Sequence, residues 1–151
     1  MKNSALLVSA SLAVSAGFSV GAGRAATQLR GGAVQMAEIG DSGVAFETVA
    51  REWRCKYSPG ESGGPGDSAS LKACNDLLME YMPKLKALPG AEITRQVCGG
   101  CMDFKVSITQ PLEEHGAFME DLALEEEFMD KLKAIDGTSL HETQEITFVK
   151  M

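Results

Sequence analysis

The residues of this sequence best suited to chemistry are the two cysteines of Cys98-Gly99-Gly100-Cys101. Such a C-x-x-C pair occurs in zinc sites, metal-chaperone sites and thiol redox sites. Zinc needs two further ligands, and the remaining cysteines, Cys55 and Cys74, form no second C-x-x-C. Cys98 and Cys101 are thus no more than candidate metal ligands, and we expect no cofactor. The favoured interpretation makes both small strand residues beside a Gly-Gly turn, with a reversible cross-hairpin disulfide as the next alternative.

The histidines do not extend this pair into an active-site pattern. His115 stands beside Glu113 and Glu114, which favours a solvated side chain, and His141 falls in a strand-like run. The glycine-rich segment 58–70 lacks the Gly spacing and the Gly-Lys-Ser/Thr ending of phosphate-binding loops, so we expect a linker there. We therefore predict no catalytic residue and a protein that is not an enzyme.

Four segments have the alternating pattern of strands with one buried face. The first, 52–57, places Trp53, Cys55 and Tyr57 on one side. The second and third, 92–98 and 101–109, flank Gly99-Gly100, which favours a two-residue hairpin turn. The inner residues expected for the third and for the last strand, 139–149, are Met102, Phe104, Val106, Ile108, Leu140, Ile146 and Phe148.

Two helices are predicted between these strands. The first begins at Asp67 or Ser68, either of which can cap it, and runs to about residue 87, with Pro83 expected to kink its last turn or end it early. The second covers about 113–134, where the run 125–127 of three glutamates indicates a solvated face, and Gly137 ends it.

A repeat joins these elements into one fold. The segment Lys84-Leu85-Lys86-Ala87 recurs 47 residues later, so strand–helix–strand occurs twice. This order predicts an α+β, ferredoxin-like βαββαβ sandwich in which both helices cover one face of a four-stranded antiparallel sheet. The other face stays open for a partner or a second copy of the chain. Candidate partner-binding residues are Trp53, Arg54, Lys56, Gly99 and Gly100, and Trp53 is equally well explained as a core residue.

Charge restricts the partners. The formal charge is −7, and the first 36 residues hold three basic and no acidic residues, which leaves −10 on the remainder. An acidic body disfavours nucleic acid and anionic lipid surfaces, both of which are bound through Lys and Arg. We therefore expect protein partners.

The N-terminal segment is typical of a targeting sequence. Residues 1–17 combine Lys2, a short apolar run and small residues at its end, which predicts a signal peptide. Residues 18–36 begin with Phe18 and are basic and acid-free. Together they resemble the bipartite leader of nucleus-encoded plastid proteins in complex-plastid algae; plain secretion is the alternative. A lead-in, 37–51, and one domain, 52–151, follow.

The segments Glu52-Trp53-Arg54-Cys55-Lys56-Tyr57 and Val97-Cys98-Gly99-Gly100-Cys101-Met102-Asp103-Phe104-Lys105-Val106, with the closing Glu142-Thr143-Gln144, carry a further similarity. They resemble a small soluble family of complex-plastid algae that includes the non-pigmented stromal subunit of the cryptophyte photosystem I–chlorophyll a/c antenna supercomplex. The resemblance implies a non-catalytic linker, peripheral at the stromal face of the thylakoid, whose partners are photosystem I core and antenna subunits.

Two other functions stay open. One is a thiol-redox or metal-binding domain that acts through Cys98 and Cys101. The other is a dimeric ferredoxin-like enzyme or small-ligand binder with a pocket between sheet and helices, which would require polar groups on the inner face. The inner residues assigned from the sequence, cysteines aside, are apolar, and this disfavours the pocket.

Overall fold

The computed structural model describes residues 36–149 as an α+β fold with a four-stranded antiparallel sheet and three helices. The predicted signal peptide, 1–17, and nearly all of the predicted transit peptide, 18–36, lie outside this range. The elements are β1 (Ala37–Glu38), β2 (Ala45–Phe46), β3 (Thr48–Tyr57), α1 (Ala69–Lys86), β4 (Glu92–Cys98), β5 (Asp103–Pro111), α2 (Leu112–Glu120), α3 (Ala123–Lys133) and β6 (Thr138–Phe148).

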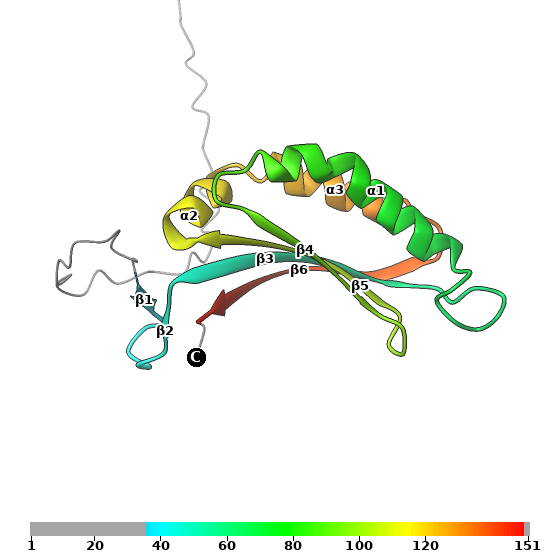
Figure 1. Ribbon diagram of the computed structural model, residues 1–151, viewed down its shortest axis with the longest axis horizontal. Helices are drawn as coiled ribbons and strands as arrows, with labels where there is room; N and C mark the ends of the chain where they lie inside the picture. The colour runs from blue at the N-terminus through cyan, green and yellow to red at the C-terminus, as the bar shows by residue number, and fades with distance from the viewer. Residues whose placement is uncertain (1–35, 150–151) are drawn as a thin grey trace, which may run out of the picture.

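The sheet has the strand order β4-β5-β3-β6, and each neighbouring pair is antiparallel. All three helices lie on one face of the sheet, and the β4–β5 hairpin bends away from them (Figure 1). None of the helices within residues 36–149 has the length and hydrophobicity that crossing a bilayer requires.

Strand β3 lies at the centre of the sheet, between β5 and β6. Trp53, Cys55 and Tyr57 are buried under the helices, as their alternation predicts. The strand begins at Thr48, inside the predicted lead-in, and the short β1–β2 hairpin precedes it. The predicted inner face of the first strand is therefore confirmed, whereas its predicted start at residue 52 is too late, because the strand begins at Thr48.

Helix α1 follows the prediction closely. Ser68 caps it, since its hydroxyl oxygen accepts a hydrogen bond from the Leu71 N–H at 3.1 Å. Its apolar stripe is buried against the sheet through Cys74, Leu77, Leu78, Tyr81 and Leu85. The helix continues through the exposed Pro83 to Lys86, so the expected early end does not occur.

The second helical stretch is two helices, not one. Asp121 adopts an extended conformation between α2 and α3, with φ −134° and ψ 94°. Its side chain accepts a hydrogen bond from the Ala123 N–H at 3.1 Å and so satisfies a backbone donor at the start of α3. The apolar periodicity of 113–134 does not indicate this break, because α2 and α3 both place apolar residues in the same core and so continue one pattern.

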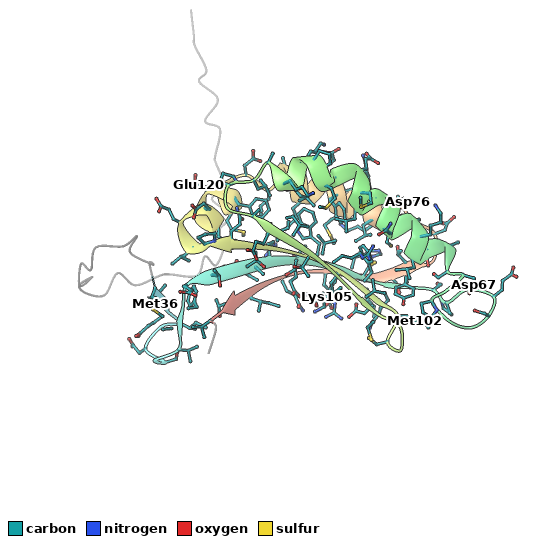
Figure 2. All side chains as sticks on the ribbon, viewed as in Figure 1. Met36, Asp67, Asp76, Met102, Lys105 and Glu120 are labelled. Atoms are coloured by element: carbon teal, nitrogen blue, oxygen red, sulfur yellow. A yellow bond between two sulfur atoms is a disulfide. The ribbon has the colours of Figure 1, made fainter. Side chains whose placement is uncertain are left out.

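The β4–β5 connection also differs from the prediction. Cys98 pairs with Asp103, so the loop contains four residues, 99–102, and Cys101 lies in the loop instead of a strand. Met102, labelled at the hairpin tip in Figure 2, has a φ of 50°. A disulfide between Cys98 and Cys101 closes this loop. The Gly-Gly pair thus forms part of a longer turn.

Strand β6 places its side chains on the opposite faces from those expected. Trp53 pairs with Thr143, so Thr143 faces the helices, whereas Ile146 pairs with Ala50 on the open face. Leu140 lies at an irregularity of the β3–β6 pairing, has a φ of 49° and is 69% exposed. Leu140 and Ile146 are therefore not inner residues, and the side chain of Phe148 is outside the described part.

Candidate binding surface at the hairpin tip and open sheet face

The hairpin tip, defined as residues 98–102, is fixed by its disulfide and by side chains of β3. The Lys56 ammonium donates to the Cys101 carbonyl at 2.8 Å, and the Tyr57 hydroxyl donates to the Cys98 carbonyl at 3.1 Å. Cys98 and Cys101 are both exposed. The tip is therefore a solvent-facing loop whose backbone is held from the central strand.

The four cysteines form two separate pairs. The Cys98–Cys101 bond leaves neither sulfur as a thiolate ligand. Cys55 and Cys74 are buried thiols with their sulfurs 3.9 Å apart. The hydrogen bond to Cys74 and burial raise the pKa of Cys55, which keeps this thiol protonated. Within residues 36–149, no cluster of His, Cys, Asp or Glu is arranged to hold a metal ion.

The open sheet face, defined as the face turned away from the helices, is polar and ion-paired. Arg54 contacts Asp103 at 2.7 Å and Glu142 at 3.4 Å, so it spans β3, β5 and β6. Lys105 contacts the buried Glu52 at 3.1 Å, and Figure 2 shows Lys105 on this side of the sheet. These pairs fix the positions of charged groups that a partner would meet.

Asp103 is the unusual member of this face. It is only 8% exposed, and its Oδ2 accepts from Arg54, while its buried Oδ1 has no hydrogen-bond partner among residues 36–149. A buried carboxylate oxygen without a donor costs free energy. Asp103 is therefore the buried anion that holds Arg54 and Lys56 in position on this face.

The predicted partner-binding residues do not all lie on this surface. Arg54 and Lys56 do, with 22% and 28% of their side chains exposed. Gly99 and Gly100 lie at the hairpin tip, where a Cβ on Gly99 would sit 3.4 Å from Pro65 Cγ. Trp53 has no exposed surface and belongs to the core, so the prediction that it contacts a partner is wrong and the alternative, a core residue, holds.

On the helix side of the sheet, opposite this surface, lies a buried hydrogen-bond network that the sequence pattern did not predict. Arg51 binds Glu125 through two hydrogen bonds, Nε to Oε2 at 2.7 Å and Nη2 to Oε1 at 2.8 Å. The Trp53 indole N–H also donates to Glu125 at 2.7 Å, and Arg51 donates to the Thr143 hydroxyl at 3.0 Å. The network therefore joins α3 to β3 and β6.

Glu125 is not part of a solvated face, as the three-glutamate run suggested. It is buried at 7% exposure, while Glu126 and Glu127 are exposed. The signal was present in the spacing, since Glu125 precedes the buried Phe128 and Met129 by three and four residues on one helix face. Burial alone would raise the pKa of Glu125, but the bonds from Arg51 and Trp53 outweigh it and lower that pKa.

His115 is also buried, against the prediction of a solvated side chain. It is 4% exposed, and Nε2 lies 3.8 Å from a Glu145 carboxylate oxygen. In the described part of the chain neither ring nitrogen has a hydrogen-bond partner. Burial, with a contribution from Arg51, lowers the pKa of His115 more than Glu145 raises it. His141 is half-buried beside the Thr138 hydroxyl at 2.9 Å, and burial and Lys133 lower its pKa.

The space between sheet and helices is filled by packed aromatic rings. Trp53 and Phe128 have centroids 4.7 Å apart, and Tyr81 meets Phe128 edge-on at 5.2 Å. A ligand pocket at this position, as the enzyme or ligand-binder alternative requires, would displace these rings. The arrangement instead favours a rigid support for the opposite face.

Neither a protein-family model nor a curated protein matches the chain.

Replacing Glu125 with glutamine removes the ionic partner of Arg51 and keeps the side-chain shape. Removing one partner of a buried ion pair costs about 3–5 kcal/mol, and Arg51 retains its hydrogen bond to Thr143. We therefore expect the free energy of unfolding, measured by urea titration, to fall by about 3 kcal/mol. The control Glu126→Gln alters an exposed neighbour and should change stability by less than about 0.5 kcal/mol. Equal effects of the two substitutions would contradict the network.

Because the pKa of His115 is lowered by folding, the unfolded chain takes up this proton at higher pH than the folded chain. Stability should therefore fall as pH drops below about 6.5, the ordinary histidine pKa. Above that pH, His115 should make no contribution to the pH dependence. His115→Leu should flatten the stability–pH curve in this range, and more than His141→Gln does, because His141 is less buried. An unchanged slope in His115→Leu, measured by urea unfolding at several pH values, would contradict this.

Proposed function

We propose that this protein is a non-catalytic docking module that binds other proteins through its open sheet face and hairpin tip. The observation that carries the proposal is the pair of partly exposed cations Arg54 and Lys56, held in place on this face at 2.7 and 3.9 Å from Asp103 Oδ2. Interfaces gain specificity from such pre-positioned charges, because a matching partner finds them already oriented. The partner would supply carboxylates near Arg54 and Lys56.

The fold that carries this surface is proposed to be the ferredoxin-like βαββαβ arrangement. The strand order β4-β5-β3-β6 and the antiparallel pairing of all neighbours support it. The two repeat units correspond to β3-α1-β4 and to β5-α2-α3-β6. Gly90 and Gly137, which both have a positive φ, follow α1 and α3 and lie 47 residues apart, as the repeated segments do. The break between α2 and α3 is a departure inside the second unit.

We place the module at the stromal face of the thylakoid in a complex plastid, bound to photosystem I and its chlorophyll a/c antenna. The leader chemistry and the resemblance of the 52–57 and 97–106 segments support this location. The acidic body supports contact through protein subunits instead of the anionic lipid surface. The module would aid assembly or stability of the supercomplex.

If this location is correct, the protein should co-migrate with the photosystem I–antenna band when solubilised thylakoids are separated on a native gel and analysed by mass spectrometry. Lys56→Glu should reduce co-migration, because it reverses a charge at the docking surface. Lys133→Glu, on the exposed helix side, is the matched control and should co-migrate normally. Recovery of the unaltered protein only in the free soluble fraction would refute the location.

A second candidate function is a thiol–disulfide couple at the hairpin tip, and the exposed Cys98–Cys101 bond favours it. A dithiol reductant would donate two electrons and two protons, which would convert the disulfide to two thiols and leave the reductant as a disulfide. The buried Cys55 and Cys74 would stay outside this exchange.

Treating the folded chain with dithiothreitol and then a maleimide should label Cys98 and Cys101 only, as read by mass spectrometry of peptides. Cys55 and Cys74 should react only after unfolding, because both are buried. A tip that resists reduction until the chain is denatured would exclude the redox couple. Labelling of all four cysteines in the folded chain would contradict the separation of the two pairs.

A further inference from the structure

Strand β4 is an edge strand with a regular pairing to its one neighbour, and its charged residues are Glu92 and Arg95. Among the described strands it pairs only with β5, and six of its seven residues are exposed. The opposite edge, β6, is interrupted near Leu140, where the pairing with β3 shifts, and it carries the exposed acids Glu142 and Glu145. Both edges carry charges, but an irregularity such as that near Leu140 hinders pairing with further strands, and the β4–β5 register has none. The edge at β4 is therefore the one open to another strand.

A groove of about 420 Å³ runs beside β4, between it and the first half of α1. Its apolar lining includes Leu71, Phe104 and Val97, of which Val97 is 44% exposed. The register of β4 against β5 places Ile93, Arg95 and Val97 on the helix side of the sheet, next to this groove. A strand added at β4 would turn alternate side chains into the groove.

The groove offers one positive charge that has no carboxylate partner among residues 36–149, although the chain as a whole is acidic. Arg95 and Lys72 line it, and Lys72 is ion-paired with Asp76 at 2.5 Å. Within the described residues, Arg95 bonds to the neutral amide oxygen of Asn75 and to no carboxylate. An incoming carboxylate would therefore meet an available guanidinium at Arg95.

We propose that β4 and this groove bind an extended segment of another protein, as a fifth strand whose inward side chains alternate between apolar and acidic. Backbone hydrogen bonds along β4 would supply affinity, Val97 and Leu71 would receive an apolar side chain, and Arg95 would receive a carboxylate. This site adds a contact beyond the open sheet face, and it does not rest on the photosystem location.

Other occupants fit the charges less well. The N-terminal 36 residues of this chain are basic and acid-free, so they offer no carboxylate to Arg95. A second copy joined through β4 would bring the Arg95 guanidinium of each chain to the same short interface, where like charges destabilise pairing.

The test uses the full ¹⁵N-labelled chain and an acetylated peptide as long as β4, which has 7 residues. In this peptide every second residue, the set that faces the groove, alternates between valine and glutamate, and the other residues are threonine. We expect this valine–glutamate peptide to shift the amide signals of β4 and of the first turn of α1. The matching valine–lysine peptide, with lysine in place of each glutamate, should not bind, because it would face Arg95 with like charge. Arg95→Glu should weaken the valine–glutamate complex about tenfold and permit the valine–lysine peptide to bind.

The control Lys133→Glu makes the same charge reversal on α3, away from the groove, and should leave peptide binding unchanged. The proposal is overturned if no β4 signal shifts, if the shifts fall on β6 or the open face, or if the two peptides bind equally. It is also overturned if the β4 signals move on dilution of the chain alone and light scattering reports a dimer, since a second copy is then the occupant.

Discussion

The bidentate pair between Arg51 and Glu125, joined by the Trp53 indole N–H, is the interaction on which the rest of the structure depends. It fixes α3 over the central strand β3. Aromatic packing extends from this pair to α1, because Phe128 of α3 packs on Trp53 and Tyr81 of α1 meets Phe128 edge-on. A shift of β3 by one residue would turn Arg51 to the open face and leave Glu125 of α3 buried without its partner, so the pair specifies register as well as adding stability.

Strand β3 connects this interior to the proposed docking surface. Its odd-numbered residues, from Arg51 to Tyr57, face the helices, while Arg54 and Lys56 alternate with them on the other side. Whatever fixes Trp53 therefore also fixes Arg54 and Lys56, since successive side chains of a strand point to opposite faces. Tyr57 and Lys56 extend this support to the backbone of the hairpin tip. The charged surface is thus rigid because the core behind it is ionic and aromatic.

Local patterns predicted the parts of the fold that local interactions decide. The alternation around Trp53, the bounds of β4 and the Ser68 cap all follow from short-range spacing. Long-range pairing decided the rest: Glu125 is buried because Arg51 lies opposite it, 74 residues away in sequence, and the faces of β6 depend on an irregular pairing at Leu140. A charge run and two isolated histidines do not reveal such partners.

Cross-linking mass spectrometry on intact thylakoids, with a lysine-reactive reagent, tests most directly whether the open sheet face is the docking surface. Lys56 and Lys105 lie on that face, whereas Lys84 and Lys131 lie on the helix layer. Docking as proposed predicts that cross-links from Lys56 and Lys105 reach photosystem I or antenna subunits, while Lys84 and Lys131 link within the chain. Intermolecular cross-links from Lys84 and Lys131 alone would contradict it.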